Sequence, residues 1–224
     1  SRNEDNARTL ANRLKTAWTT HIHKISQEAD IYLFAIKDDV LEEVIWQVPG
    51  NQGLWVHTSG FLPMDIFKGY SERYGVMYPL QTFTKERALD LRHVPIFIEA
   101  CMPEDEELLT EFALQLSSNV QILDSEKRKY LHVAAVFACN FCNHLYAIAY
   151  QILEENKISP NVLLPLIEET ANKVRTLHPL KAQTGPAVRN DLEMINRHIA
   201  LLTDPELKTI YQTISNHILK GTKP

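Results

Sequence analysis

Apolar residues dominate one long stretch of the chain, from Glu126 to Glu154, and their pattern predicts a single helix. Between Leu131 and Leu153, nearly every position on all sides of a helical projection is Ala, Val, Phe, Leu, Ile, Cys or Tyr. A helix that is apolar all round is typical of a protein core. We therefore expect this helix to be buried on every side and the rest of the fold to be arranged around it.

Four polar side chains interrupt the middle of this helix, and they are His132, Asn140, Asn143 and His144. At about 100° per residue, Asn143 falls within about 20° of His132 in projection, while Asn140 lies about 80° and His144 about 120° from it. A buried polar group without a hydrogen-bond partner costs about 1–3 kcal/mol. Two interpretations fit the pattern. In one, neighbouring core helices supply hydrogen-bond partners for the four side chains. In the other, the four side chains line an active site.

The first half of the chain alternates between short apolar runs and amphipathic segments. The runs predict strands at Ala17 to His21, Ile31 to Ile36, Gly53 to His57, Tyr74 to Tyr78, Val94 to Glu99 and Val120 to Leu123. Helices are predicted at Asn3 to Lys15, Asp38 to Trp46 and Glu104 to Leu116. The run from Ile31 to Ile36 is continuously apolar, which is typical of a parallel strand buried on both faces. This alternation of strands and helices predicts a doubly wound α/β sheet.

The alternation stops near Asp124, and the rest of the chain is predicted to be helical. After the long apolar helix, helices are predicted at Ser159 to Leu177, Ala187 to Leu202 and Pro205 to Leu219. We therefore predict two domains, an α/β domain in residues 1–124 and an all-α domain in residues 125–224. No internal repeat or low-complexity linker separates them.

Charge and cysteine content exclude several classes of function. The net charge of −5 and the pI near 6.0, with scattered Lys and Arg, argue against a nucleic-acid partner. Three cysteines fit a reducing, cytoplasmic setting, and Cys139 with Cys142 offers only two ligands on one helix, so we predict no metal site. We find no signal peptide and no apolar run that we expect to span a membrane.

Two loops follow predicted parallel strands and are candidates for ligand binding by position. Ligands bind beyond the carboxyl ends of such strands, where this chain has Lys37 and Asp38 after one strand and Ser59 and Gly60 after the next. A helix cap at Asp38 and a turn glycine at Gly60 are equally common interpretations of these residues.

The glycines do not form the loop that a dinucleotide-binding sheet needs. Seven glycines occur in the chain, and none belongs to a GxGxxG motif. We interpret the chain as beginning just after the second strand of such a sheet. There Ser1 and Arg2 supply the hydroxyl and guanidinium groups that suit a 2′-phosphate.

Five motifs in order carry a resemblance to a known family. They are HTSG (57–60), YPLQTF (78–83), LHVAAVFACN (131–140), PLIEET (165–170) and AQTGPAVRND (182–191). With them the chain resembles, over essentially its whole length, the bacterial Rossmann-like proteins that have a helical C-terminal domain of unknown function and are associated with NADP-dependent oxidation and reduction. The layout is more distantly similar to pyrroline-5-carboxylate reductases and β-hydroxyacid dehydrogenases.

The resemblance implies a truncated Rossmann-type parallel sheet followed by an all-α domain that completes the active site. It implies NADP as the cofactor, with residues of three segments along it. They are Ser1 and Arg2 at the ribose phosphate, Lys37 and Asp38 along the cofactor, and His57, Ser59 and Gly60 toward the nicotinamide. Because the first strand and glycine-rich loop are not in this chain, we expect NADP binding by this chain to be weak or absent.

The resemblance also places the chemistry on the long helix. In β-hydroxyacid dehydrogenases this helix supplies a Lys and an Asn to the reacting carbonyl, and the corresponding helix here offers His132 and Asn140. A histidine can exchange the proton that accompanies hydride transfer at neutral pH. Lys129 is a possible substitute for His132, although a solvated residue in the first turns of the helix is the more common interpretation. Substrate-binding residues are predicted at Gln81, Thr82, Asn143, Thr184, Gly185 and Arg189.

Arg189 has two interpretations of about equal weight. Its guanidinium can bind a substrate carboxylate through two hydrogen bonds. It can equally form an ion pair with Asp191 or with another acidic residue of the same helix or of a second subunit.

Two functions fit these features. The first is an NADP-dependent oxidoreductase that acts on a small carbonyl, imine or hydroxy acid. The alternative is a non-catalytic dimeric module that binds a nucleotide or metabolite. In both, we expect a homodimer through the helical domain, because only three other helices are available to cover the apolar one.

Overall fold

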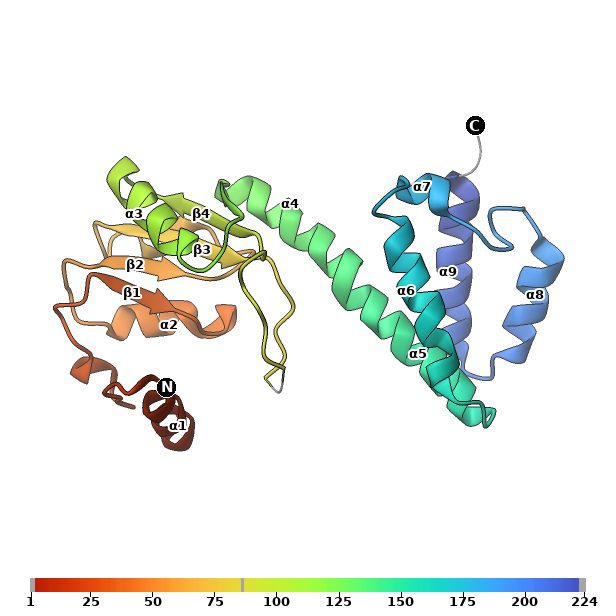
Figure 1. Ribbon diagram of the computed structural model, residues 1–224, viewed down its shortest axis with the longest axis horizontal. Helices are drawn as coiled ribbons and strands as arrows, with labels where there is room; N and C mark the ends of the chain where they lie inside the picture. Colours follow the sequence, from red (N-terminus) through yellow and green to blue (C-terminus); the bar gives the residue numbers. More distant parts are fainter. Residues whose placement is uncertain (1–2, 86, 222–224) are drawn as a thin grey trace. The chain divides into compact units, whose positions relative to one another are not determined.

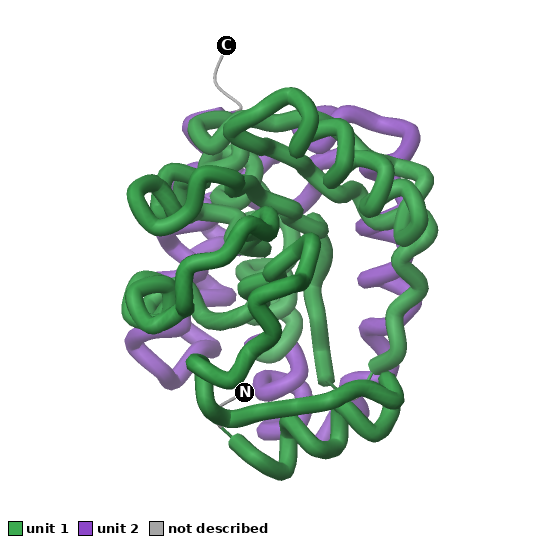
Figure 2. Tube along the Cα trace, turned by 90° about the vertical axis from the view of Figure 1, so that its left-hand side faces the viewer, with its two compact units in different colours: residues 1–147 green, residues 148–224 purple. Residues whose placement is uncertain are grey.

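The structure is a computed structural model that describes residues 3–85 and 87–221. It divides into two compact units, residues 1–147 and residues 148–224, which Figure 2 shows in two colours. The predicted domain boundary at residue 124 coincides with the end of the sheet, whereas this division falls within the long helix. The functional assignment of residues 1–124 and 125–224 stays a prediction.

A five-stranded sheet with the strand order β1-β2-β3-β4-β5 forms the core of the first unit (Figure 1). Its strands are β1 (Ile31–Phe34), β2 (Leu54–His57), β3 (Tyr74–Pro79), β4 (Ile96–Ala100) and β5 (Val120–Ile122). β1, β2 and β3 are parallel, β4 is antiparallel to β3, and β5 is parallel to β4. The predicted α/β class is confirmed. The antiparallel step explains why no helical crossover is described between β3 and β4.

Helices cover both faces of the sheet, because side chains of successive strand residues point to opposite faces. In β2, Val56 packs in a cluster with Leu109 of α3 (Pro103–Leu114). Trp55 packs on the other face with Leu41 of α2 (Asp38–Gln47). Figure 1 shows α2 and α3 on opposite sides of the sheet. This unit also contains α1 (Glu4–Leu14) and the short 3₁₀ helix η2 (Met64–Phe67).

One predicted strand is wrong. The segment from Ala17 to His21 is irregular and leads into a 3₁₀ turn, η1 (Ile22–Lys24). The Thr19 hydroxyl oxygen accepts a hydrogen bond from the His21 backbone N–H at 3.0 Å. Such local side-chain bonds compete with a strand ladder for backbone groups.

The long apolar helix forms as one element. It consists of α4 (Ser125–Ala135), a π-helical segment η3 (Val136–Phe141) and α5 (Cys142–Glu155). Together they make a 31-residue helix that is long and apolar enough to cross a membrane by length and composition. The prediction that no apolar run has the length and composition of a membrane span is therefore wrong. A single such helix is weak evidence, because core helices of soluble proteins meet the same test.

The expectation that this helix is buried on all sides is also wrong for the single chain. None of the side chains of η3 or α5 is buried, and Phe137 and Phe141 are 64% and 50% exposed. Apolar composition indicates that a surface tends to be covered, but it does not indicate which chain covers it.

The π-helical segment changes which polar side chains share a face. A turn closed by i→i+5 bonds holds about one extra residue, so positions beyond Phe141 rotate by about 100° relative to a regular helix. Asn143 therefore lies about 80° from His132 in projection and His144 about 20° from it. The projection that grouped His132 with Asn143 is wrong, because it assumed a regular helix.

The second unit is helical, as predicted. After the end of α5 it contains η4 (Pro160–Leu163), α6 (Leu164–Lys173), α7 (Pro179–Ala182), α8 (Leu192–Leu201) and α9 (Pro205–Gly221). The helix predicted from Ala187 begins instead at Leu192. Asn190 has a positive φ of 54°, and the Asp191 side chain accepts a hydrogen bond from the Met194 N–H at 3.0 Å. An aspartate at this position caps a helix and sets its first turn.

Candidate functional site

The carboxyl ends of β1, β2 and β3 meet at one edge of the sheet because the three strands are parallel. Asp38 begins α2 directly after the loop that follows β1, and Ser59 follows β2. The Ser59 hydroxyl donates to the Asp38 carboxylate at 2.6 Å. The structure therefore brings together two of the residues predicted to line the cofactor.

The Ser59 hydroxyl is already used within the protein. Besides donating to Asp38, its oxygen accepts from the backbone N–H groups of Phe61 and Leu62, each at 3.0 Å. A hydroxyl has one donor and two acceptor positions. Ser59 thus shapes the loop after β2, and its predicted direct contact with a cofactor is not tested by this geometry.

His57, another predicted cofactor residue, is fully buried at the end of β2. Its Nδ1 accepts from the Ser59 N–H at 3.1 Å, and its Nε2 lies 3.3 Å from the Pro63 carbonyl oxygen, to which it donates. Burial, followed by the nearby Arg128 charge, lowers the pKa of His57 from 6.5 to about 4. His57 is therefore a neutral core histidine that supports the loop.

Gly60 provides the closest approach between the sheet edge and the long helix. A Cβ at Gly60 would overlap His132 Nδ1 and would lie 2.9 Å from Tyr78 Cζ. His132 is half-buried on α4, and its Nδ1 lies 3.1 Å from the Tyr78 hydroxyl at the end of β3. The predicted catalytic histidine therefore lies against the predicted nicotinamide-side glycine, within the first unit.

This close approach predicts a specific effect of enlarging Gly60. We expect Gly60→Ala to push the His132 ring away from Tyr78 and to lower the free energy of unfolding by about 1–3 kcal/mol, as overpacking does in cores. Chemical denaturation measures the change. The matched control is Gly50→Ala, since a Cβ at Gly50 meets no atom within 4 Å. Equal stabilities of the two variants would contradict the contact.

Arg128, which is not among the predicted site residues, anchors the start of α4 close to this site. Its side chain is 1% exposed, and its Nη1 donates to Glu99 Oε2 of β4 at 2.6 Å. Nη2 donates to the Leu62 carbonyl, and the Ser125 hydroxyl donates to the same Glu99 carboxylate at 2.6 Å. The loop that carries Gly60 is thus fixed by Ser59 on one side and by Arg128 on the other.

A spacing signal for this network was present in the sequence. Ser125, Arg128 and His132 stand at i, i+3 and i+7, so they share one face of the helix. Arg128 lies within a run of three basic residues, a pattern that is usually solvated. Among the described residues, Arg128 Nε is the buried side-chain polar atom left without a hydrogen-bond partner.

The other predicted site residues lie apart from this cluster or outside the described residues. Ser1 and Arg2 fall outside the described residues, and Lys37 is exposed beside Asp38. Gln81 and Thr82 are exposed after β3, where the Gln81 side chain accepts from the Thr82 N–H at 2.8 Å. Asn140 and Asn143 lie further along the long helix, where neither side chain is buried.

Three predicted substrate residues belong to the second unit. Thr184 and Arg189 are exposed there, and Gly185 has a φ of 110°, which favours glycine. Their roles stay predictions. In the described part of the chain, no group of three or more His, Cys, Asp or Glu side chains is arranged to hold a metal ion.

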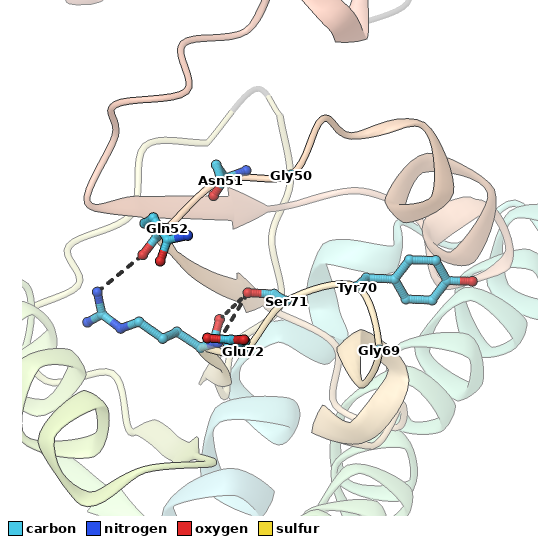
Figure 3. A pocket seen from close by; sticks show the side chains of 8 residues that line it. Gly50, Asn51, Gln52, Gly69, Tyr70, Ser71 and Glu72 are labelled. Carbon is cyan, nitrogen blue, oxygen red and sulfur yellow. Dashed lines mark hydrogen bonds between the residues drawn. The ribbon is translucent and has the colours of Figure 1, made fainter.

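A hollow of about 490 Å³ lies at the opposite, amino ends of β2 and β3 (Figure 3). It is lined by Gly50, Asn51, Gln52, Gly69, Tyr70, Ser71, Glu72 and Arg73. Arg73 pairs with the buried carboxylate of Asp105, with Nε 3.1 Å from Oδ1. Its charge is thereby neutralised within the protein, and ligands of parallel sheets bind at the other end. We therefore assign the site to the carboxyl ends.

Comparisons with known proteins agree with this layout. Residues 94–218 match the family described as "Domain of unknown function (DUF2520)". A Bacteroides fragilis protein, provisionally named as an NADP oxidoreductase, is 41% identical with a TM-score of 0.91, over 98% of this chain and 86% of that chain. No curated protein matches the chain.

Two further solved structures are similar in fold. A Thermotoga maritima protein is 22% identical with a TM-score of 0.81, over 100% of this chain and 90% of that chain. An imine reductase from Myxococcus stipitatus, in complex with NADP+, is 13% identical with a TM-score of 0.64, over 98% of this chain and 82% of that chain. At these identities the likeness shows the fold alone.

Proposed function

Since this chain belongs to the family described as "Domain of unknown function (DUF2520)", we propose that it is an NADP-dependent oxidoreductase acting on a small carbonyl, imine or hydroxy acid. One observation carries the proposal. An acid–base side chain, His132, contacts Gly60 at the carboxyl ends of parallel strands, which is where dinucleotide-binding sheets hold their ligands. The name of the Bacteroides fragilis protein supports the same chemistry.

Residues at this edge fit different parts of the cofactor. The exposed ammonium of Lys37 suits phosphate oxygens, whereas the Asp38 carboxylate would repel phosphates and suits ribose hydroxyls. Gly60 adds no side chain at its position in the loop after β2. When bound, NADPH supplies the hydride that reduces the substrate carbon. Because no GxGxxG motif occurs in this chain, we expect weak binding.

His132 supplies the accompanying proton exchange in this proposal. One ring nitrogen is bonded to Tyr78, and within residues 3–85 and 87–221 no hydrogen bond is made by the other. A histidine with one free ring nitrogen can direct that nitrogen at a substrate oxygen or imine nitrogen and, in its imidazolium form, give the substrate a proton. Asn140 lies about 12 Å further along the helix, so only an elongated substrate reaches both.

The test is NADPH consumption with a panel of carbonyl and imine substrates at high cofactor concentration. We expect turnover, and we expect His132→Gln to lower kcat/KM by about a hundredfold to ten-thousandfold. The exposed His93 is the matched control as His93→Gln. Cofactor binding without any turnover, together with a purely structural effect of His132→Ala, would favour the non-catalytic dimeric module instead.

A homodimer through the helical region is part of the proposal. Phe137 and Phe141 stack edge to face at 5.0 Å, and both are at least half exposed in the single chain. Burying such side chains contributes about 1.5–3 kcal/mol each. We also propose a cytoplasmic location, because a second copy of the chain would cover the apolar helix without a membrane.

The dimer predicts a result in sedimentation velocity. We expect a dimer at micromolar concentration and a monomer for the double variant Phe137→Lys, Phe141→Lys, because two ammonium groups cannot be buried unpaired. Trp46→Lys is the control, as Trp46 is 75% exposed on α2. A monomeric wild-type protein would rule out this part of the proposal.

A further inference from the structure

We propose that Tyr78 is a positioning residue for His132: its phenol donates a hydrogen bond to Nδ1 and thereby keeps the hydrogen of the neutral imidazole on Nε2. The catalytic meaning of this arrangement rests on the proposed function. The hydrogen-bond assignment itself does not, and it can be measured in a protein with no known substrate.

The geometry holds the imidazole on two sides. The Tyr78 hydroxyl lies 3.1 Å from His132 Nδ1, and the two rings meet edge to face, with centroids 6.0 Å apart and planes at 71°. Gly60 is so close that a Cβ there would overlap Nδ1. Tyr78 is itself held by packing against Phe97 of β4, with ring centroids 6.5 Å apart. The orientation of the His132 ring is therefore determined by its neighbours.

The direction of the hydrogen bond follows from the burial of Tyr78. Its side chain is 8% exposed, and among the described residues His132 Nδ1 is the acceptor within reach of its hydroxyl. If His132 donated Nδ1–H instead, the phenolic hydrogen would be left unpaired in a buried place, at a cost of about 1–3 kcal/mol. Burial raises the pKa of Tyr78, against an opposing effect of Arg128, so the phenol keeps its hydrogen.

The consequence lies at the other ring nitrogen. With Nδ1 accepting, the neutral His132 carries its hydrogen on Nε2 and presents an N–H donor. Among the described residues, no protein group bonds that nitrogen. An N–H at this position can bind the oxygen of a carbonyl or the nitrogen of an imine and stabilise the charge that develops there. Tyr78 thus determines which chemical group the site offers to a substrate.

The test is nitrogen NMR of protein whose histidines carry a nitrogen isotope label, which reports the two imidazole nitrogen signals. The spectra are recorded at a pH where His132 is neutral. His132→Gln assigns the signal. We expect the wild-type spectrum to show a protonated Nε2 and an unprotonated Nδ1, and we expect Tyr78→Phe to move both signals toward the average of the two tautomers. The control is Tyr130→Phe, on the same helix and 78% exposed, which should leave them unchanged.

A wild-type signal with the hydrogen on Nδ1 would overturn the inference without any variant, so a Tyr78→Phe protein that fails to fold does not prevent the test. An unchanged His132 signal in folded Tyr78→Phe would also overturn it. If the protein turns over substrate, Tyr78→Phe should lower kcat about fivefold to tenfold, the size of one hydrogen bond, with KM little changed. If it turns over none, the proposed function fails while the hydrogen-bond assignment stands or falls by NMR.

Discussion

Lowering the pH from neutrality toward 4 is expected to destabilise the first unit by about 3 kcal/mol through His57 alone. Burial and the nearby Arg128 charge lower the pKa of His57 from 6.5 to about 4. Below pH 6.5 the unfolded chain therefore binds a proton that the folded chain does not. The contribution of neutral His57 is complete above pH 6.5 and is lost as the pH falls to about 4.

This window is separate from that of the carboxylates with lowered pKa values. Hydrogen bonds from Arg92 lower the pKa of Asp90 from 3.8 to about 2, and a bond from Lys127 lowers that of Asp124. Both carboxylates are exposed, and their protonation affects stability only below pH 3.8. Loss of stability between pH 6.5 and 4 therefore does not come from these two carboxylates, and a His57 variant tests whether it comes from His57.

Denaturant unfolding at several pH values, followed by tryptophan fluorescence, measures the effect, since Trp55 is buried in the strand that carries His57. We expect His57→Gln to be less stable than wild type at neutral pH and to lose much less stability on acidification. His93→Gln, in an exposed position, should keep the wild-type dependence. Parallel pH profiles for wild type and His57→Gln would contradict the assignment.

Replacing Arg128 by Met is expected to destabilise the protein by about 3–5 kcal/mol, the largest effect predicted for a single side chain here. The side chains of Arg128 and Glu99 are 1% and 12% exposed. Removing the guanidinium would leave the Glu99 carboxylate buried without its charge partner. It would also release the Leu62 carbonyl, which is two residues beyond Gly60.

A double variant separates the buried charge from the loss of packing. Replacing both partners, as in Arg128→Met with Glu99→Leu, should recover part of the lost stability, because no uncompensated charge remains. Lys129→Met is the matched control, since Lys129 is partly exposed and its partner Glu126 is 77% exposed, so that this ion pair should contribute less than about 1 kcal/mol. If Arg128→Met and Lys129→Met were equally stable, the anchoring role of Arg128 would be wrong.

Periodicity was sufficient to predict most of the sheet and its helices. The strands that contain Trp55 and Ile98 were found because apolar runs of strand length, bounded by turn residues, are typical of buried strands. The strand predicted at Ala17 to His21 failed because local threonine bonds replace a ladder there. The antiparallel direction of β4 was not visible, since a single strand carries no signal of its direction.

The candidate site was predicted only in part. His132 and Gly60 were selected, one from its place in an apolar helix and the other from its place after a strand, and the structure brings them together. Tyr78 and Arg128 were missed, because an aromatic residue in a strand and an arginine in a basic run are usually structural or solvated. Their roles depend on contacts between residues far apart in the chain, which no local pattern contains.

The long helix shows a different limit of sequence analysis. Its composition correctly predicted a helix, but the π-helical turn between Val136 and Phe141 rotates Asn143 away from His132. A projection that assumes a regular α-helix cannot reveal the extra residue in a π-helical turn. Composition also could not distinguish burial within the chain from burial against a second chain or a membrane.

The most direct measurement of the central claim is a map of backbone amide NMR shifts during titration with NADPH at millimolar concentration, a method that detects weak binding. If the carboxyl ends of the parallel strands hold the cofactor, the amides of Asp38, Gly60 and His132 should shift, while those of Gly69 and Ser71 at the amino ends should not. Shifts confined to the amino ends, or no shifts near Gly60 and His132 at saturating NADPH, would contradict the account.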